Sequence, residues 1–384
     1  MYTSQRVIEN FETFQLQVSK NTLWRLLCLT SEDGVEGWAE FTIAAPHDEI
    51  EQRIGQVAAR FESLRGKKSC SDNFGDLLAD WRVGTALASA VDQAFWDLDA
   101  RTAQLPLAQH IRAQTLDTEK TTQPVTQVGL YANINRGIKD RSPEGFAAQA
   151  IAALKSGHKA IKIAPFDGLT PARCDSTEGR TLIRAGLERV SAVSQVLGAQ
   201  AELRVDCHWR FDEETAVALV EPLAERGVKW FECPIEEHVA NVASLARIKE
   251  VANLSEMQLV GCETMSRWSM FAPYVENAGY DVIMPDVKYL GRLQDLVQIV
   301  HRADALGVGV ALHNPTGPVA HLASVHATAA LTPESRLEFQ YDESPLFSES
   351  VVDGLPSTDG GETTYPNSPG IGRLPDRSVW CKDG

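Results

Sequence analysis

Three apolar segments that each carry an acidic residue constrain this chain most strongly. They are VDCHWRF (205–211), WFECPIEE (230–237) and VGCETM (260–265), with the acids Asp206, Glu232 and Glu263. The spacing of 26 and 31 residues leaves room for a crossover helix between successive strands, so the three carboxylates are expected to converge at one edge of a parallel sheet. Buried like charges require a cation, and oxygen-only ligands favour Mg²⁺ over zinc. The alternative for each acid alone is a helix cap or an ion pair.

The segments around these acids belong to a longer alternation of strands and helices. Eight apolar segments have the length of buried strands: 128–134, 160–165, 201–208, 229–234, 258–264, 281–286, 307–315 and 336–341. Amphipathic segments such as 143–157 and 294–307 separate them. This pattern predicts an α/β fold with a (β/α)₈ barrel over residues 126–341. Residues 1–125 have a hairpin signal at 32–34 and a helical stretch at 86–104, which predict an α+β capping domain. Residues 342–384 are expected to pack on that domain.

Charge and cysteine content limit the partners and the compartment. The 384 residues carry a net charge of −16, which argues against binding of nucleic acid or anionic membranes. No apolar stretch reaches the length of a membrane span, and the N-terminus lacks a signal-peptide pattern. Seven cysteines without CxxC spacing predict a reduced, intracellular protein, with the cytoplasm as the expected location.

Further polar residues lie at the ends of the predicted barrel strands, where active sites of such barrels are built. They are Asn133, Asn135, Lys162, His208, Asp286, His313 and Glu338. Charged residues on buried strands need a reason. Because side chains alternate along a strand, Asp206 and His208 are expected on the same face. Asp286 and His313 end neighbouring strands, which favours a His–Asp pair that fixes the imidazole tautomer and raises its basicity.

These residues together resemble the enolase superfamily, in its mandelate racemase subgroup. Asp206, Glu232 and Glu263 resemble the magnesium triad of the family, and Asp286 with His313 resembles its His–Asp dyad. GVEGWAEF (34–41) resembles the capping hairpin, and SPGIGRL (368–374) the C-terminal closure. The resemblance implies abstraction of a proton α to a carboxylate, with Mg²⁺ and cationic groups stabilising the enediolate. It also implies a homodimer or a homo-octamer.

One departure from the usual pattern and one further motif favour one branch of that subgroup. Racemases and many dehydratases of the subgroup carry Lys-x-Lys after the second strand, whereas here the motif is Lys162-Ile163-Ala164. Asp206-x-His208 resembles galactonate- and mannonate-type acid-sugar dehydratases, in which that histidine is an acid/base group. The segments YANINR (131–136), DCHWRF (206–211) and HNPTGPV (313–319) also resemble cis-3-hydroxyproline dehydratases.

The prediction is a Mg²⁺-dependent dehydratase, a hydro-lyase, that acts on a small 3-hydroxy carboxylate such as an acid sugar or cis-3-hydroxy-L-proline. His313 is the expected base, Asp286 orients it, and His208 is the expected acid. Lys162 and Glu338 are expected at the substrate carboxylate. The expected substrate contacts are Asn133, Asn135, Arg136 and, from the loop 14–22, Lys20. Two alternatives remain: a racemase or epimerase with the histidines on either side of the α-carbon, and a catalytically silent barrel that acts as a binding protein.

Overall fold

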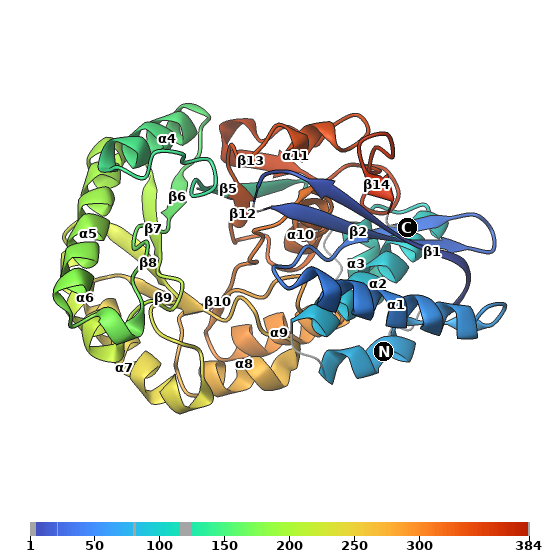
Figure 1. Cartoon of the computed structure of the whole chain (residues 1–384), viewed down its shortest axis with the longest axis horizontal. Coiled ribbons are helices and arrows are strands. Elements are labelled where there is room, and N and C mark those ends of the chain that lie inside the picture. The colour runs from blue at the N-terminus through green and yellow to red at the C-terminus, as the bar shows by residue number, and fades with distance from the viewer. Residues whose placement is uncertain (1–4, 21, 80–81, 116–123, 383–384) are drawn as a thin grey trace.

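The chain folds around two β-sheets, as the computed structural model shows for residues 5–20, 22–79, 82–115 and 124–382. One sheet is antiparallel and combines N-terminal strands with the C-terminal end of the chain. The other is parallel and curves into a barrel, which lies beside the antiparallel sheet in Figure 1. The predicted fold class, a (β/α)₈ barrel with an α+β capping domain, is confirmed.

The capping sheet has the strand order β14-β1-β2-β3, with β4 paired to β1. Its strands are β1 (Arg6–Gln17), β2 (Leu23–Ser31), β3 (Glu36–Glu40), β4 (Lys68–Ser69) and β14 (Cys381–Lys382). The predicted hairpin joins β2 to β3, and Gly34 turns it with a φ of 77°, which costs glycine little because it has no Cβ. Strand β1 continues to Gln17, so the connection to β2 is shorter than the predicted loop 14–22.

In the described part of the chain, four helical segments complete the capping domain. They are α1 (His47–Ser63), the 3₁₀ helix η1 (Ser71–Ala79), α2 (Val83–Thr102) and α3 (Leu107–Thr115). Helix α2 is buried along most of its length, and its acids bind backbone groups of other segments. Asp92 accepts a hydrogen bond from Leu293 N at 2.7 Å, and Asp97 accepts one from Trp38 N at 2.9 Å and one from Ile371 N at 2.7 Å. Helix α2 therefore joins the capping sheet to the barrel and to the C-terminal segment.

Eight parallel strands form the barrel in the order β11-β10-β9-β8-β7-β6-β5-β12. They are β5 (Gln127–Asn133), β6 (Ala160–Ile163), β7 (Glu202–Asp206), β8 (Val228–Glu232), β9 (Gln258–Gly261), β10 (Val282–Ile283), β11 (Gly309–Val310) and β12 (Leu337–Gln340). A cluster of buried apolar side chains from neighbouring strands includes Trp230, Val260, Val282, Met284 and Ala311. Inward-facing residues of this kind make the barrel a packed core below the site.

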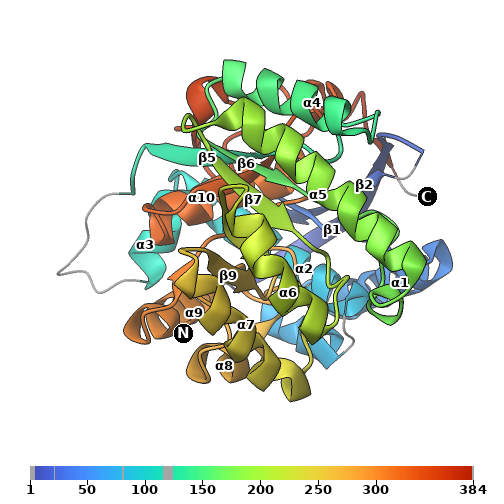
Figure 2. The same ribbon diagram turned by 90° about the vertical axis from the view of Figure 1, so that its left-hand side faces the viewer.

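Helices follow the strands and cover the barrel from outside, as Figure 2 shows for α4 to α8. They are α4 (Pro143–Lys155), α5 (Thr177–Leu197), α6 (Glu213–Ala224), α7 (Val242–Leu254), α8 (Arg267–Glu276), α9 (Leu293–Ala305) and α10 (Pro318–Leu331), with the short η3 (Pro171–Arg173) and η4 (Val239–Asn241). Ser142, Ser176 and Asp212 cap α4, α5 and α6 by accepting hydrogen bonds from backbone N–H groups. Such caps satisfy N–H groups that have no partner inside the helix.

The barrel has a seam between its first and last strands in the pairing order. Within the described residues, no backbone pairing joins β11 to β12. Side chains hold the two together instead: Asn314 Nδ2 donates to Glu338 O at 2.8 Å, and Ser335 Oγ donates to Val310 O at 2.6 Å. Regular pairing in β10 and β11 is short, so Asp286 and His313 lie beyond the strand ends rather than on them.

The C-terminal segment contacts both domains. It contains α11 (Leu346–Glu349), η5 (Asp359–Gly361) and β13 (Glu362–Thr364) before β14. Strand β14 pairs with β1 of the capping sheet, whereas β13 pairs with β5 of the barrel. The sequence predicted packing on the capping domain and gave no expectation for the barrel. The barrel contact was missed because β13 is only three residues long.

Among the described helices, none is long and apolar enough to cross a membrane.

Candidate active site

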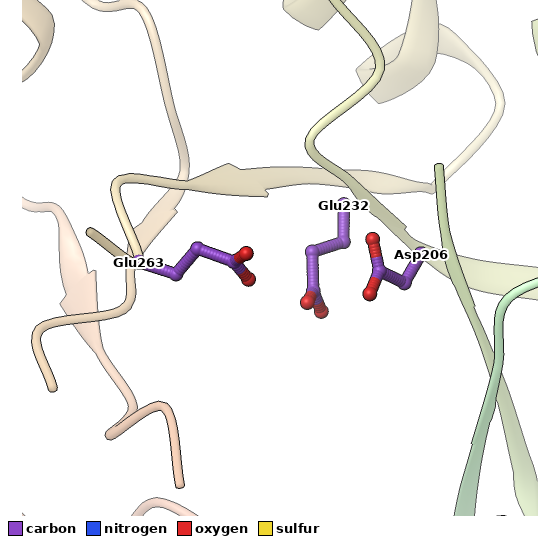
Figure 3. Close-up of side chains that lie close together, drawn as sticks. All are labelled: Asp206, Glu232 and Glu263. Atoms are coloured by element: carbon purple, nitrogen blue, oxygen red, sulfur yellow. The ribbon is translucent and has the colours of Figure 1, made fainter. Parts of the chain in front are cut away.

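Three buried carboxylates meet at the mouth of the barrel. Asp206 ends β7, Glu232 ends β8, and Glu263 follows β9, and Figure 3 shows the three side chains pointing toward one another. One oxygen from each lies within 4.8 Å of the others. All three residues are at most 5% exposed. Burial raises the pKa of Glu263 to about 8, despite the opposing effect of His313. The cluster is therefore short of positive charge.

Lys162 on β6 supplies one of the cations. Its Nζ lies 2.6 Å from Glu232 Oε1 and 3.0 Å from Glu338 Oε1, and the side chain is fully buried. Burial opposes the charged form, but Glu232 and Glu338 outweigh it and hold the pKa of Lys162 well above its usual range. Lys162 thus stays protonated and joins a metal-site acid to strand β12.

Glu338 on β12 is fully engaged by the protein. Its Oε1 accepts hydrogen bonds from Asn133 Nδ2 at 2.7 Å and from Gln340 Nε2 at 3.2 Å, in addition to the contact with Lys162. Its Oε2 accepts from Asn314 N at 3.0 Å. Burial opposes ionisation, but Lys162 and His313 lower the pKa of Glu338 to about 2. With both oxygens occupied, Glu338 is placed to orient Lys162 and the His313 loop.

His313 and Asp286 form a buried pair on the neighbouring side of the mouth. His313 Nδ1 lies 3.0 Å from Asp286 Oδ2, which leaves Nε2 directed at the carboxylates, 3.4 Å from Glu263 Oε2. This second distance is an ion-pair contact without hydrogen-bond alignment, because Glu263 Oε2 has no hydrogen-bond partner. Burial lowers the basicity of His313, but Glu263, Asp286 and Glu338 raise its pKa to about 9.

His208 contacts Asp206, but a turn brings it there rather than strand alternation. Strand β7 ends at Asp206, and His208 has a φ of 48°, so the expected period-2 geometry does not extend to it. His208 Nε2 lies 2.9 Å from Asp206 Oδ2, and the side chain is 43% exposed. Asp206 raises the pKa of His208 to about 9. The contact also holds the pKa of Asp206 below its usual range although burial opposes this.

The expected substrate contacts fall into two groups. Asn133 is buried against Glu338, and Asn135 donates to Asn133 Oδ1 at 2.6 Å and accepts from Ala164 N at 2.5 Å. These two residues belong to the floor and rim of the site. Arg136 forms an ion pair with Glu343 at 2.9 Å, and Lys20 is exposed in the turn after β1. Among the described contacts, none joins Lys20 to a site residue.

Several site residues were missing from the prediction. Trp230 Nε1 donates to Glu232 Oε2 at 2.6 Å, and Lys288 Nζ lies 3.7 Å from Asp286 Oδ2. Each lies two positions from a predicted site residue in the sequence, and this proximity was the one indication that either could belong to the site. Glu40 of β3 accepts hydrogen bonds from Gly317 N at 2.7 Å and Ala320 N at 3.0 Å at the start of α10. No sequence pattern relates Glu40 to a helix almost 280 positions later.

A cavity of about 400 Å³ lies over the loops that follow β6 to β9. Arg82 from the start of α2, Trp209 and Thr264 are among its lining residues, so both domains border it. Thr264 and Trp209 directly follow Glu263 and His208 in the chain.

The donor set fits a hard divalent cation. Three convergent carboxylates, one with a buried oxygen that accepts no hydrogen bond, supply only oxygen ligands. Lys162 pairs with one of the three carboxylates, and both histidines carry raised pKa values, so nearby protein groups already respond to the excess negative charge.

Comparisons with known proteins agree with this geometry. The family described as "Enolase C-terminal domain-like" matches residues 145–379, and "Mandelate racemase / muconate lactonizing enzyme, N-terminal domain" matches residues 13–111. D-gluconate dehydratase of Thermoproteus tenax is 27% identical over 77% of this chain, which spans 55% of that enzyme's length. D-galactonate dehydratase of Ralstonia pickettii is 24% identical over 91% of this chain and 88% of its own length.

Solved structures share the fold along nearly the whole chain. A mandelate racemase/muconate lactonizing enzyme from Sulfitobacter sp. has a TM-score of 0.81 at 20% identity, covering 98% of this chain and 94% of that one. A member of the enolase superfamily from Salmonella Typhimurium has a TM-score of 0.79 at 17% identity, covering 97% and 99%. The first family model matches more than half of the chain. The chain therefore belongs to the enolase superfamily, in its mandelate racemase / muconate lactonizing enzyme subgroup.

Proposed function

We propose that the protein is a Mg²⁺-dependent dehydratase of a small 3-hydroxy carboxylate. The observation that carries the proposal is a pair of histidines on two sides of one carboxylate cluster, on the loops after β7 and β11. Loss of water from such an acid needs a base for the α-proton and an acid for the β-hydroxyl. The acid-sugar dehydratases among the relatives support this reaction class.

Asp206, Glu232 and Glu263 would hold the metal. Bound there, Mg²⁺ supplies positive charge to a substrate carboxylate and so favours the anion that forms when the α-proton leaves. Lys162 Nζ adds a second fixed charge to the same region, because Glu232 and Glu338 hold it in place. Donors that are already oriented for the developing charge lose little energy to reorganisation.

His313 is assigned as the base. Its Nδ1 is engaged by Asp286, so Nε2 is the nitrogen that faces the carboxylates and a bound substrate. The carboxylate of Asp286 fixes the ring and stabilises the imidazolium that forms. Glu338 has both oxygens occupied, so we assign it to positioning Lys162 rather than to substrate contact.

His208 is assigned as the acid for the leaving hydroxyl. Its side chain is 43% exposed, against 11% for His313, which suits delivery of a proton to a departing hydroxyl. Asn135, Arg136 and the turn that carries Lys20 remain proposed contacts for the rest of the substrate. Acid sugars and cis-3-hydroxy-L-proline both have the required hydroxyl. An epimerase that uses the two histidines on opposite faces of the α-carbon is the alternative, and a homodimer or homo-octamer is the proposed assembly.

A screen tests the proposal. Purified protein is mixed with acid sugars and hydroxyprolines, and 2-keto or imine products are measured in D₂O. We expect water loss from one class, abolished by chelator and restored by Mg²⁺ or Mn²⁺. Scrambling of the α-configuration without water loss would favour the epimerase. Full turnover after exhaustive chelation would contradict the metal assignment.

A further inference from the structure

The backbone leaves the regular sheet just before Glu263. The ladder between β8 and β9 ends with Cys233 N donating to Val260 O at 2.9 Å. Beyond it, Cys233 has a φ of 44° and Cys262 a φ of 69°. Left-handed conformations of this kind are costly for residues with a Cβ and persist only where the surroundings hold them. The residue that follows the second of them is a carboxylate of the proposed metal site.

Glu237, in the loop after β8, binds the freed backbone group. Its Oε1 accepts a hydrogen bond from Cys262 N at 2.5 Å and a second from the hydroxyl of Tyr280 at 2.8 Å. A buried backbone N–H that leaves a sheet needs a partner of this kind. The loop of one metal-site acid, Glu232, thereby holds the residue directly before another, Glu263.

The chain leaves space for this contact at Gly261. A Cβ at that position would overlap both Glu237 Oε1 and the ring of Tyr280. Tyr280 is fully buried, and it directs its hydroxyl at the same carboxylate oxygen. Two separate segments, at residues 261–262 and at Tyr280, therefore surround one oxygen atom of Glu237.

We propose that Glu237 is a positioning residue for Glu263: it holds the left-handed turn at Cys262 and so aims the Glu263 carboxylate at the metal site. The inference rests on the proposed metal site. Glu237 itself is not among the three converging carboxylates. Groups that orient metal ligands in this way typically contribute 10–100-fold, as an order of magnitude, to metal affinity.

Two conservative variants separate geometry from charge. Glu237→Gln keeps an oxygen at the right reach for Cys262 N and Tyr280, so Mn²⁺ and Mg²⁺ affinity should stay close to wild type. Glu237→Asp keeps the charge but withdraws the oxygen by one methylene, and affinity should fall by about 10–100-fold. Binding is measured by Mn²⁺ titration with electron paramagnetic resonance and by calorimetry with Mg²⁺. Glu236→Ala removes the adjacent exposed carboxylate and should leave metal affinity unchanged.

A second readout does not use the metal. Amide hydrogen exchange in a peptide covering residues 258–265 should accelerate in Glu237→Asp and not in Glu237→Gln, with thermal unfolding as the check that both variants fold. Wild-type affinity in Glu237→Asp, or an equal loss in Glu237→Gln, would overturn the positioning role. If wild-type protein binds neither Mn²⁺ nor Mg²⁺, the proposed function fails instead, and the exchange measurement still tests whether Glu237 holds the turn.

Discussion

The two sides of the barrel mouth are built differently. His313 is 11% exposed, and Asp286 contacts its Nδ1. At the start of the helix that follows its loop, the backbone N–H of Gly317 donates a hydrogen bond to Glu40 of the capping domain. His208 is 43% exposed and lies in a left-handed turn together with Trp209. The difference is consistent with the proposed roles, in which the buried, fixed His313 takes the proton and the more accessible His208 serves the leaving group. Burial and fixed partners suit a base that must act on a weakly acidic proton.

Charge also differs between the two sides. On the accessible side His208 holds the pKa of Asp206 below its usual range despite burial, whereas on the buried side burial raises the pKa of Glu263 to about 8. The two carboxylates serve the same proposed metal site. Because the pKa of Glu263 is raised and that of Asp206 is lowered, metal binding would displace a proton from the Glu263 side rather than from the Asp206 side.

The largest effect that would sharpen this comparison comes from Asp286→Asn. The amide can still contact His313 Nδ1, but it does not stabilise the imidazolium, so kcat should fall by about 10²–10⁴-fold. KM and Mg²⁺ affinity should change little, because Asp286 is not in the carboxylate triad. Steady-state kinetics with thermal unfolding as a control measures this. An unchanged kcat would show that the buried pair is structural only.

Metal affinity should depend on pH because Glu263, on the buried His313 side, has a raised pKa. Because the pKa of Glu263 is raised to about 8, raising the pH from 6 to 8 removes a competing proton and should strengthen Mg²⁺ binding by about tenfold per pH unit. Asp206 adds nothing in this range, since its pKa is lowered. Calorimetry in buffers of different ionisation enthalpy should detect proton release on binding. Constant affinity without proton release would remove the proposed difference between the carboxylates.

A smaller effect is expected from variants at the starts of the two helices that follow the histidine loops, α10 and α6. Glu40→Ala leaves Gly317 N and Ala320 N without their acceptor, at a cost of about 1–3 kcal/mol in unfolding free energy, and should also lower kcat. Asp212→Ala removes the cap of α6, on the His208 side, and should cost about 0.5–2 kcal/mol with kcat unchanged. Denaturant unfolding and kinetics on both variants provide the measurement. An equal loss of kcat in Glu40→Ala and Asp212→Ala would contradict the proposed difference between the His313 and His208 sides.

Sequence reasoning reached the parts of the site that follow from strand order. Asp206 and Glu232 end consecutive strands, and Glu263, Asp286 and His313 follow the ends of the next three, so strand order brings them to one edge of the barrel. Their positions could be predicted because each strand is a short apolar run with a polar end.

The remainder depends on packing between distant segments. The left-handed turn at His208, the acceptor role of Glu237 and the contact of Glu40 with α10 have no periodic signal. The seam between β11 and β12 also relies on side chains, which alternation cannot indicate. Such features arise from tertiary satisfaction of backbone groups rather than from local propensity.

Exchange of the α-proton with D₂O tests the division of roles between the histidines most directly. The substrate is the carboxylic acid that the screen identifies. With this substrate, His313→Asn should lose both dehydration and exchange of the α-proton, because no other group takes the proton. His208→Asn should lose dehydration by about 10²–10⁴-fold yet retain slow exchange. The reverse pattern, with exchange lost in His208→Asn and kept in His313→Asn, or near wild-type activity in both, would contradict the account.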